Sequence, residues 1–375
     1  MTLKLKIMCN LEPEEMQGSL IWGAPFASIN LKRIISIVFL YVLAAGLIMP
    51  VLVSAEENWG TFSVYFENDM FSGTDRHYTN GVKLSWISPD LTDYAKSDRL
   101  PKWSLPFIQG LPFINEPGLQ RNVVLSIGQN MYTPSDIKQE ALIEDDRPYA
   151  GWTYFGIGLH SKNERHLDSM EIQLGIVGPE SFAEQTQKLV HELRGSQIAN
   201  GWDNQIKNEP GLAFVYERKW RFLYSRTVGK SGLDLIPHLG GALGNIYTYA
   251  NAGMEARIGW NIPRDFGTSF IRPAGGSNAP LNAQDPRLSR GQDFSLYVFA
   301  MADGRAVLRN IFLDGNTFTD SHSVDKKYFV ADVGAGVGLI IHRFKLCYTH
   351  VLRTKEFKGQ KDEQIFGSIT LAFTY

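Results

Sequence analysis

The sequence predicts an all-β fold, a transmembrane barrel of twelve antiparallel strands with one short helix in an extracellular loop. Three observations predict it. Apolar and polar residues alternate along many segments, an export signal stands near the start, and the chain ends on an amphipathic strand whose last residue is Tyr375. In an outer membrane, such alternation separates lipid-facing from lumen-facing positions. One sheet of a soluble sandwich shows the same pattern, so the sandwich remains the alternative fold.

Residues 1–55 are predicted to be an N-terminal extension and signal peptide, and residues 56–375 to be the barrel. An apolar run from Ile34 to Val53 follows two basic residues, and small residues ending at Ala55 follow the run, as at a signal peptidase site. A run of this length would also serve as an uncleaved transmembrane anchor. The segment before it is long for a signal peptide, which a start codon placed too far upstream would explain.

The composition narrows the class of partner and the means of stabilisation. A formal net charge of −2 leaves no basic surplus, which argues against nucleic acid as the main partner. Of the two cysteines, Cys9 precedes the signal and only Cys347 would remain in the exported chain. An internal disulfide is therefore excluded, and something other than cross-links must hold the exported chain together.

Period-two alternation marks the predicted strands one by one. In the first strand, Phe62, Val64 and Phe66 share one face and Glu67 lies on the other. The final aromatic residue of the last strand resembles the assembly signal of bacterial outer-membrane proteins. The candidate strands lie near residues 60–67, 79–88, 121–130, 150–160, 168–177, 211–221, 233–244, 251–261, 291–304, 327–341, 343–353 and 364–375.

The strand count and the connections define the kind of barrel. Twelve is even, as single-chain bacterial barrels require, and a barrel of this size has a narrow, partly filled lumen that is too small for a general porin. The segments Pro89 to Gln120 and Ile262 to Arg290 are rich in Pro, Gly and Asn, so we expect loops there rather than domains.

Three polar stretches fall in the first three outer loops if the first strand begins at the periplasmic side. They are FENDMFSGTDRHYTNG, GQNMYTPSDIKQEALIEDDRPYAGW and VGPESFAEQTQKLVHELRGSQIANGWDNQ. All three then share one rim of the barrel. Because binding and catalytic residues concentrate on loops that a rigid scaffold positions, we expect the functional site at this rim.

The first of these stretches offers ligands for a metal ion. Asn68 and Asp69 carry the oxygen atoms that hard cations such as calcium prefer. Strand alternation puts Asp69 and Thr79 on the lumen-side face of adjacent strands, with Asn68 on the opposite face unless the strand ends there. The alternative is that the Asn, Asp and Gly residues of this stretch only shape a turn. Two acids, Asp69 and Asp75, bracket a glycine in the stretch, which favours the cation site.

Two cations in the second stretch are candidates for binding a lipid head group. Lys138 and Arg147 would meet anionic phosphates there. The alternative is a solvated loop in which Arg147 pairs with Asp145.

The third stretch contains an amphipathic helix that opens at Pro179 and ends at the C-cap Gly195. Gln187 and His191 are four residues apart and therefore neighbours on its polar face, together with Glu184 and Lys188. Its apolar stripe consists of Phe182, Ala183, Thr186, Leu189, Val190 and Leu193.

A rim helix of this kind would lay its stripe against acyl chains and turn its polar face to the barrel wall. His191 would then act as a general base on water. The alternative is a surface histidine. Should His191 be structural, the other candidate bases are His77, Glu67 and Asp75. The sequence has neither the second histidine of a zinc-protease helix nor a G-x-S-x-G elbow.

The order of the motifs ENDMF, TDRHYTNG, GQNMYTPSD, DDRPYAGW, VGPESFAEQTQKLVHEL and GWDNQ resembles the outer-membrane lipid A 3-O-deacylase (LpxR) family, from about Trp59 to Tyr375. The resemblance implies a twelve-stranded barrel in the outer membrane of a Gram-negative bacterium. It also implies removal of the 3-linked acyloxyacyl chain of lipid A, with calcium forming the oxyanion hole and a histidine activating water. We expect a monomer.

The resemblance also assigns roles to individual residues of this sequence. Asn68, Asp69 and Thr79 match calcium ligands, and His191 matches the catalytic base with Gln187 four residues before it. Lys138 aligns with a lysine of the second loop that the family uses. On this resemblance, the acids of the stretch FENDMFSGTDRHYTNG would build a calcium site. An outer-membrane phospholipase and a non-enzymatic small channel remain the alternative functions.

Overall fold

The computed structural model of the protein describes residues 59–69, 77–91, 102, 105–111, 116–221, 230–268, 270–271, 279–288 and 294–375. The predicted extension and signal peptide of residues 1–55 lie outside the described residues, and so does Asp75. Within the predicted loop from Pro89 to Gln120 the structure has a short helix, α2 (Leu105–Gly110). No helix among the described residues is long and apolar enough to cross a membrane.

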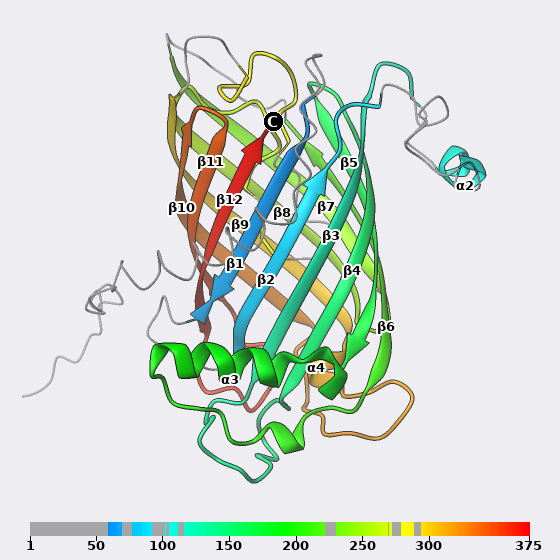
Figure 1. The fold of residues 1–375 in the computed structure, drawn as a ribbon, viewed down its shortest axis with the longest axis vertical. Helices are drawn as coiled ribbons and strands as arrows, with labels where there is room; N and C mark the ends of the chain where they lie inside the picture. The colour runs from blue at the N-terminus through cyan, green and yellow to red at the C-terminus, as the bar shows by residue number, and fades with distance from the viewer. Residues whose placement is uncertain are drawn as a thin grey trace, which may run out of the picture. The chain divides into compact units, whose positions relative to one another are not determined.

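In the described part of the chain, twelve antiparallel strands form one closed barrel (Figure 1). Each strand pairs with its neighbours in the sequence, and β1 pairs with β12 to close the cylinder. This arrangement confirms the predicted fold and strand count. The strands are β1 (Thr61–Asn68), β2 (His77–Ile87), β3 (Gln120–Thr133), β4 (Ala150–Lys162), β5 (His166–Val177), β6 (Glu209–Trp220), β7 (Ser231–Gly244), β8 (Tyr247–Trp260), β9 (Phe294–Asn310), β10 (Phe329–Ile341), β11 (Phe344–Arg353) and β12 (Gln364–Thr374).

Hydrogen bonds of Tyr375 extend the pairing of β1 with β12, which closes the barrel. Gly60 N donates to Tyr375 O at 3.2 Å, and Tyr375 N donates to Gly60 O at 3.1 Å. The Trp86 indole donates to the Tyr375 hydroxyl at 2.6 Å. We call this end of the barrel the inner rim, and we call the end with the β1–β2, β3–β4 and β5–β6 connections the outer rim.

The alternation predicted from the sequence is the alternation of the barrel wall. On β3, Leu125 and Ile127 are exposed, whereas Ser126 between them is buried in the lumen. There the Ser126 hydroxyl donates to Glu171, which also pairs with Lys83 at 3.2 Å. Apolar side chains on the outer face and paired polar groups inside are the pattern of a barrel in lipid.

The outer half of the lumen is filled by aromatic side chains. Tyr132 stacks on Phe312 with ring centroids 4.1 Å apart, and Tyr78 meets Phe366 edge-on at 5.5 Å. Phe312 belongs to the short helix α4 (Ile311–Asp314), which follows β9 and is buried apart from its last residue. The barrel interior at this level is therefore a packed hydrophobic core.

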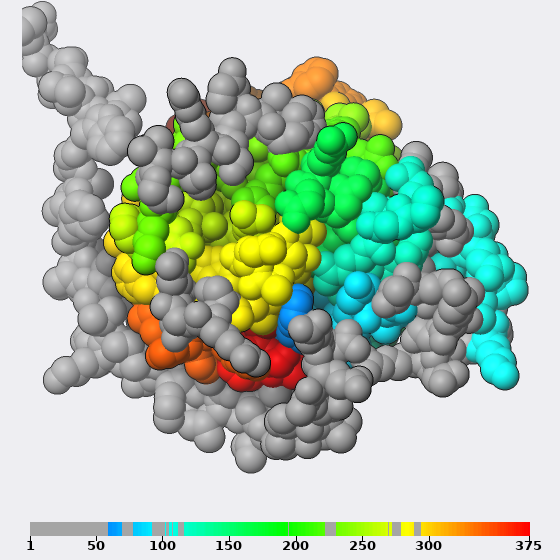
Figure 2. Space-filling view, turned by 90° about the horizontal axis from the view of Figure 1, so that it is seen from above, coloured from blue at the N-terminus to red at the C-terminus, as the bar shows by residue number. Residues whose placement is uncertain are grey.

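The connection between β8 and β9 enters the lumen from the inner rim. We call its described residues, within 262–288, the lumen segment. In Figure 2, which looks onto the inner rim, this yellow segment occupies the middle of the barrel. Its Phe266, Phe270 and Ile271 are buried. The sequence predicted a loop here but did not predict that the loop would fill the lumen.

A buried ion network anchors the lumen segment. Asp265 contacts Arg257 at 2.6 Å, Lys345 at 2.7 Å and Arg287 at 3.1 Å. Burial raises the pKa of Asp265, but Lys345, Arg257 and Arg287 lower it more, with Lys345 the largest of the three. The pKa of Asp265 therefore lies well below the usual range of an aspartate. The carboxylate is therefore ionised and ties two strands to the segment.

Asp265→Ala should lower the free energy of unfolding by roughly 3–5 kcal/mol, because it leaves buried cations without their shared carboxylate. Denaturant unfolding, followed by heat-modifiable gel mobility, measures this loss. The matched control is Asp325→Ala, which removes the exposed pair with Lys358 at 3.0 Å and should change stability little. Equal losses in the two variants would contradict a stabilising role of the lumen network.

Candidate functional site on the outer wall

A helix lies across the outer surface of the barrel at its outer rim (Figure 1). This helix, α3 (Ala183–Arg194), contacts β3 and β4. The sequence predicted one helix from Pro179. Instead, a 3₁₀ turn, η4 (Pro179–Ser181), comes first, because Phe182 adopts a left-handed conformation with φ 57°. Gly195 caps the far end with φ 64°, as predicted.

Side chains of the wall hold the beginning of the helix. Gln129 Nε2 and Thr153 Oγ1 donate to Ser181 O at 2.7 and 2.6 Å. Gly151 lies beneath, and a Cβ atom there would come within 2.1 Å of Ser181 Oγ and 2.3 Å of Ala183 Cβ. The helix thus packs on the wall at a distance that only glycine permits at this position.

The helix turns its polar face to the wall and an apolar face outwards. Gln187 and His191 are 3% and 5% exposed, whereas Phe182, Leu189 and Leu193 are 64%, 56% and 73% exposed. This orientation agrees with the prediction for a rim helix. Ala183, which the sequence assigned to the apolar stripe, is instead buried against the wall.

The hydrogen bond of His191 defines its tautomer. Its Nδ1 lies 2.5 Å from the backbone carbonyl oxygen of Gln197, in the turn after the helix. Because a carbonyl oxygen only accepts, Nδ1 carries the hydrogen, and the lone pair of the neutral ring is on Nε2. This is the arrangement in which a histidine accepts a proton at Nε2.

Gln187 is oriented by a buried tryptophan. Trp202 begins the short turn η5 (Trp202–Asn204), is 1% exposed and donates from Nε1 to Gln187 Oε1 at 2.7 Å. The amide oxygen is thereby used, and Gln187 Nε2 is a buried donor without a hydrogen-bond partner among the described residues. The fixed amide presents an N–H donor one helical turn from His191.

Thr79 faces outwards and not into the lumen, contrary to the prediction. Its hydroxyl lies 2.7 Å from that of Thr133, and Thr133 is on the same face of β3 as Met131, which packs with Ala183 and Trp202. A bulge between Tyr78 and Asn80 shifts the register, so alternation counted along β2 gives the wrong face.

Asn68 and Asp69 lie at the outer end of β1. Asn68 shares the outward-facing parity of Phe66, and it pairs with Asn80, the residue after Thr79. Asp69 follows the strand and is 1% exposed. Asn68 and Thr79 are therefore neighbours on the outer side of the barrel wall, where both are buried.

The donor chemistry of this group suits a hard cation. No group of three or more His, Cys, Asp or Glu with metal-binding geometry occurs among the described residues. A cation here would be held by one carboxylate and by amide, hydroxyl, backbone and water oxygens. These donors fit calcium and do not fit zinc, which prefers nitrogen and sulfur ligands.

The two predicted head-group cations lie in different surroundings. Lys138 is exposed on the β3–β4 connection, where its carbonyl accepts from Asn200 Nδ2 at 3.2 Å. Arg147 is 1% exposed and donates to Glu356 at 3.0 Å. The predicted surface pair of Arg147 with Asp145 is replaced by this buried one.

The guanidinium of Arg147 belongs to the packing of the lumen mouth. It lies over the ring of Tyr132, with its Cζ atom 5.3 Å from the ring centroid, and over Phe357 at 5.7 Å. Burial raises the pKa of its partner Glu356, but Arg147 and Arg353 lower it more, so the carboxylate is ionised. Arg147 thus lies at the lumen mouth, whereas Gln187 and His191 lie between α3 and the outer side of the barrel wall.

The family model described as outer membrane protein LpxR matches residues 37–375. The chain belongs to this family. The solved structure of LpxR from Salmonella typhimurium matches with a TM-score of 0.63 at 17% identity, over 84% of this chain and 99% of that chain. The likeness supports the same fold, and family membership makes this chain an outer-membrane β-barrel.

Other solved barrels are less similar. The β domain of the Bordetella autotransporter BrkA gives a TM-score of 0.40 at 10% identity, over 84% of this chain and 97% of that chain. The translocator domain of NalP from Neisseria meningitidis gives 0.33 at 8% identity, over 92% and 95%. A comparison with curated protein sequences finds no match.

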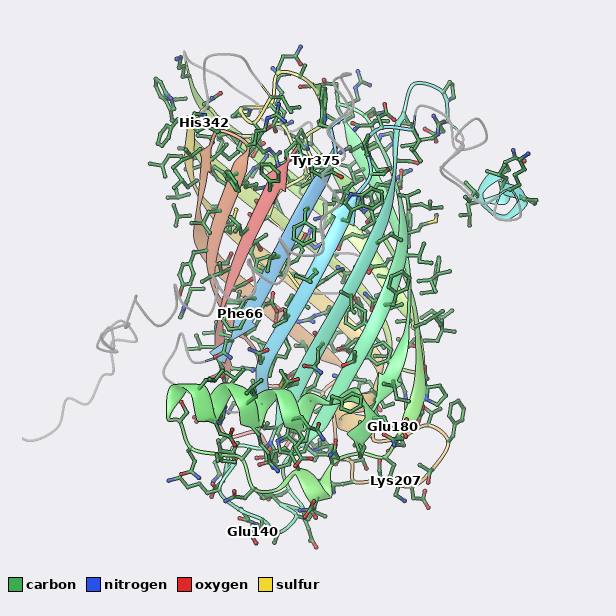
Figure 3. All side chains as sticks on the ribbon, in the orientation of Figure 1. Phe66, Glu140, Glu180, Lys207, His342 and Tyr375 are labelled. Carbon is green, nitrogen blue, oxygen red and sulfur yellow. The ribbon has the colours of Figure 1, made fainter. Side chains whose placement is uncertain are left out.

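Sequence reasoning missed two residues that build the site in this LpxR-family chain. Gly151 and Trp202 lie in the motifs DDRPYAGW and GWDNQ, yet nothing in the sequence says that one accommodates a helix and the other fixes Gln187. Figure 3 shows how densely side chains gather at the outer rim, where Glu140, Glu180 and Lys207 are labelled.

Gly151→Ala should displace α3 while leaving the barrel closed, because the added methyl overlaps Ser181 and Ala183. Hydrogen–deuterium exchange should rise throughout residues 183–194 and stay unchanged in the strands. The control is Gly304→Ala, where the nearest atom to a new Cβ is 3.9 Å away. Unchanged exchange in Gly151→Ala would mean that the helix does not depend on this close approach.

Proposed function

We propose that the protein is a calcium-dependent ester hydrolase that removes the 3-linked acyloxyacyl chain of lipid A. The observation that carries the proposal is the burial of His191 and Gln187 between α3 and the outer wall, beside outward-facing Phe182, Leu189 and Leu193. A lipid with acyl chains alongside the barrel would reach His191 without entering the lumen. Membership in the LpxR family supports lipid A as that lipid.

The hydrogen bonding of His191 supports a role as general base. Its Nε2 would take a proton from water as the water oxygen attacks the ester carbonyl carbon, and would return the proton to the departing alkoxide. The carbonyl of Gln197 would stabilise the imidazolium through Nδ1–H. Gln187 Nε2 would donate to the ester oxygen as it gains negative charge.

The oxygen donors at the outer-rim ends of β1 and β2 support a place for calcium. Asn68, Asp69 and Thr79 would hold the ion, which when bound supplies electrostatic stabilisation of the negative charge on the ester oxygen. Lys138, exposed on the neighbouring connection, would contact a phosphate of the lipid head group. Arg147 has no part in this assignment because its guanidinium is buried against Glu356.

The two alternative functions differ in how well they suit the barrel. A channel is disfavoured by the lumen segment and by the aromatic packing at the outer half of the lumen. A phospholipase would use the same wall site and the same chemistry. Membership in the LpxR family favours lipid A over a glycerophospholipid as the substrate.

Purified protein with calcium should remove from lipid A a mass equal to the 3-linked acyloxyacyl group, as read by mass spectrometry. A calcium chelator should abolish the reaction reversibly, because added calcium restores the ligand shell. Asp69→Ala should lose activity that added calcium does not restore, because the carboxylate ligand is gone.

The control substrate is a glycerophospholipid vesicle without lipid A. Release of fatty acid from these vesicles, with lipid A left intact, would replace the proposed substrate by phospholipid. Wild-type turnover in Asp69→Ala would mean that the cation site lies at other residues.

His191→Ala should lose about 10²–10⁴-fold in rate, the usual contribution of a positioned general base. His191→Asn should lose as much, because an amide forms a hydrogen bond but takes no proton near neutral pH. Initial rates of lipid A deacylation measure both losses. Both variants should keep heat-resistant gel mobility, because α3 lies outside the strand pairing of the barrel.

The matched control is Glu192→Ala, the exposed neighbour of His191 on the same helix, which should retain the wild-type rate. Near-normal rates in both His191 variants would make His191 a surface-packing residue. Loss of heat-resistant mobility would make it structural.

A further inference from the structure

Glu67 belongs to the same motif as Asn68 and Asp69, but its side chain lies on the other side of the barrel wall. It is 2% exposed inside the lumen. Its Oε1 accepts from Ile271 N at 2.7 Å and from Ser368 Oγ at 3.2 Å, and its Oε2 accepts from the Tyr78 hydroxyl at 2.9 Å. Both carboxylate oxygens are thus used within the lumen.

The hydrogen bond between Glu67 and Tyr78 ties together the two strands that carry the outer-wall oxygens. Glu67 immediately precedes Asn68, and Tyr78 immediately precedes Thr79. Because successive residues of a strand point to opposite faces, an inward-facing pair is followed by an outward-facing pair. At β2 the bulge after Tyr78 makes Thr79 the outward residue.

The third strand at this level and the lumen segment complete the arrangement. Ser368 belongs to β12 and pairs with Glu67 in register. Ile271 belongs to the lumen segment, which enters from the inner rim and reaches Glu67 near the end of β1. Gln364 Nε2 donates to Tyr78 O at 3.0 Å, so the backbone of Tyr78 is held as well as its hydroxyl.

We infer that Glu67 is a positioning residue that acts through the barrel wall, holding Asn68 and Thr79 in place for calcium from the lumen side through Tyr78, Ser368 and Ile271. This inference rests on the proposed function in one respect, the binding of calcium by the outer-wall oxygens. The lumen segment is, on this basis, part of the support of the site and not only a filling of the barrel.

Tyr78→Phe tests the inference because it removes one hydroxyl and keeps the ring. Calcium binding is measured by isothermal titration calorimetry of the folded, chelator-treated protein in detergent. The dissociation constant should rise about tenfold, since the loss of a buried hydrogen-bond partner costs on that order. Glu67→Ala should raise it further, and Glu67→Gln should recover most of the affinity because an amide oxygen still accepts from Ile271 N.

The matched control is Tyr297→Phe. Tyr297 is also a buried lumen tyrosine, with its hydroxyl 3.4 Å from Cys347 Sγ. Its loss should leave the calcium affinity unchanged. Heat-modifiable mobility confirms that each variant is folded. If Tyr78→Phe does not fold, Ser368→Ala carries the test with an expected rise of several-fold.

The outcomes separate this inference from the proposed function. An unchanged dissociation constant in Tyr78→Phe, or an equal rise in Tyr297→Phe, overturns the inference while wild-type deacylation of lipid A stands. A tenfold rise in a protein that leaves lipid A intact supports the inference and overturns the proposed substrate. Absence of calcium binding in the wild-type protein overturns both.

Discussion

The pairing of β1 with β12 is the contact on which the remaining structure depends. In a bilayer every backbone N–H and C=O has to find a partner within the protein, and only closure removes the two free edges of a sheet. Register from Thr61–Thr374 to Asn68–Gly367 achieves this closure, and the hydrogen bonds between Gly60 and Tyr375 extend it to the last residue. Closure also fixes which side chains face the lumen and which face outwards.

A wall one residue thick gives neighbouring residues entirely different environments. Glu67 lies in a packed lumen among hydrogen-bond donors. Asn68, the next residue in the chain, faces the outer side of the barrel wall. The same holds for Tyr78 and Thr79, where a bulge decides the sides. A short motif can therefore build the core with one residue and the candidate site with the next.

The stabilising contacts described above lie in the lumen, and the candidate site lies on the outer wall. Among the described residues, aromatic packing and the Asp265 network fill much of the interior. The candidate site is instead formed between the wall and α3, where Gly151 permits close contact and Trp202 fixes Gln187. Because the helix buries its polar face and exposes Phe182, Leu189 and Leu193, it suits an apolar surrounding.

The sequence by itself determined the strand pattern, the barrel and the polar stretches at one rim, because alternation with period two is a local property that survives in the fold. It also predicted the helix of Gln187 and His191, from its apolar stripe and the C-cap Gly195. Only the tertiary structure decided the face of Thr79, the buried partner of Arg147 and the entry of the lumen segment into the barrel. These depend on a register shift and on contacts between residues distant in the chain, such as Glu67 and Ile271, which no local pattern records.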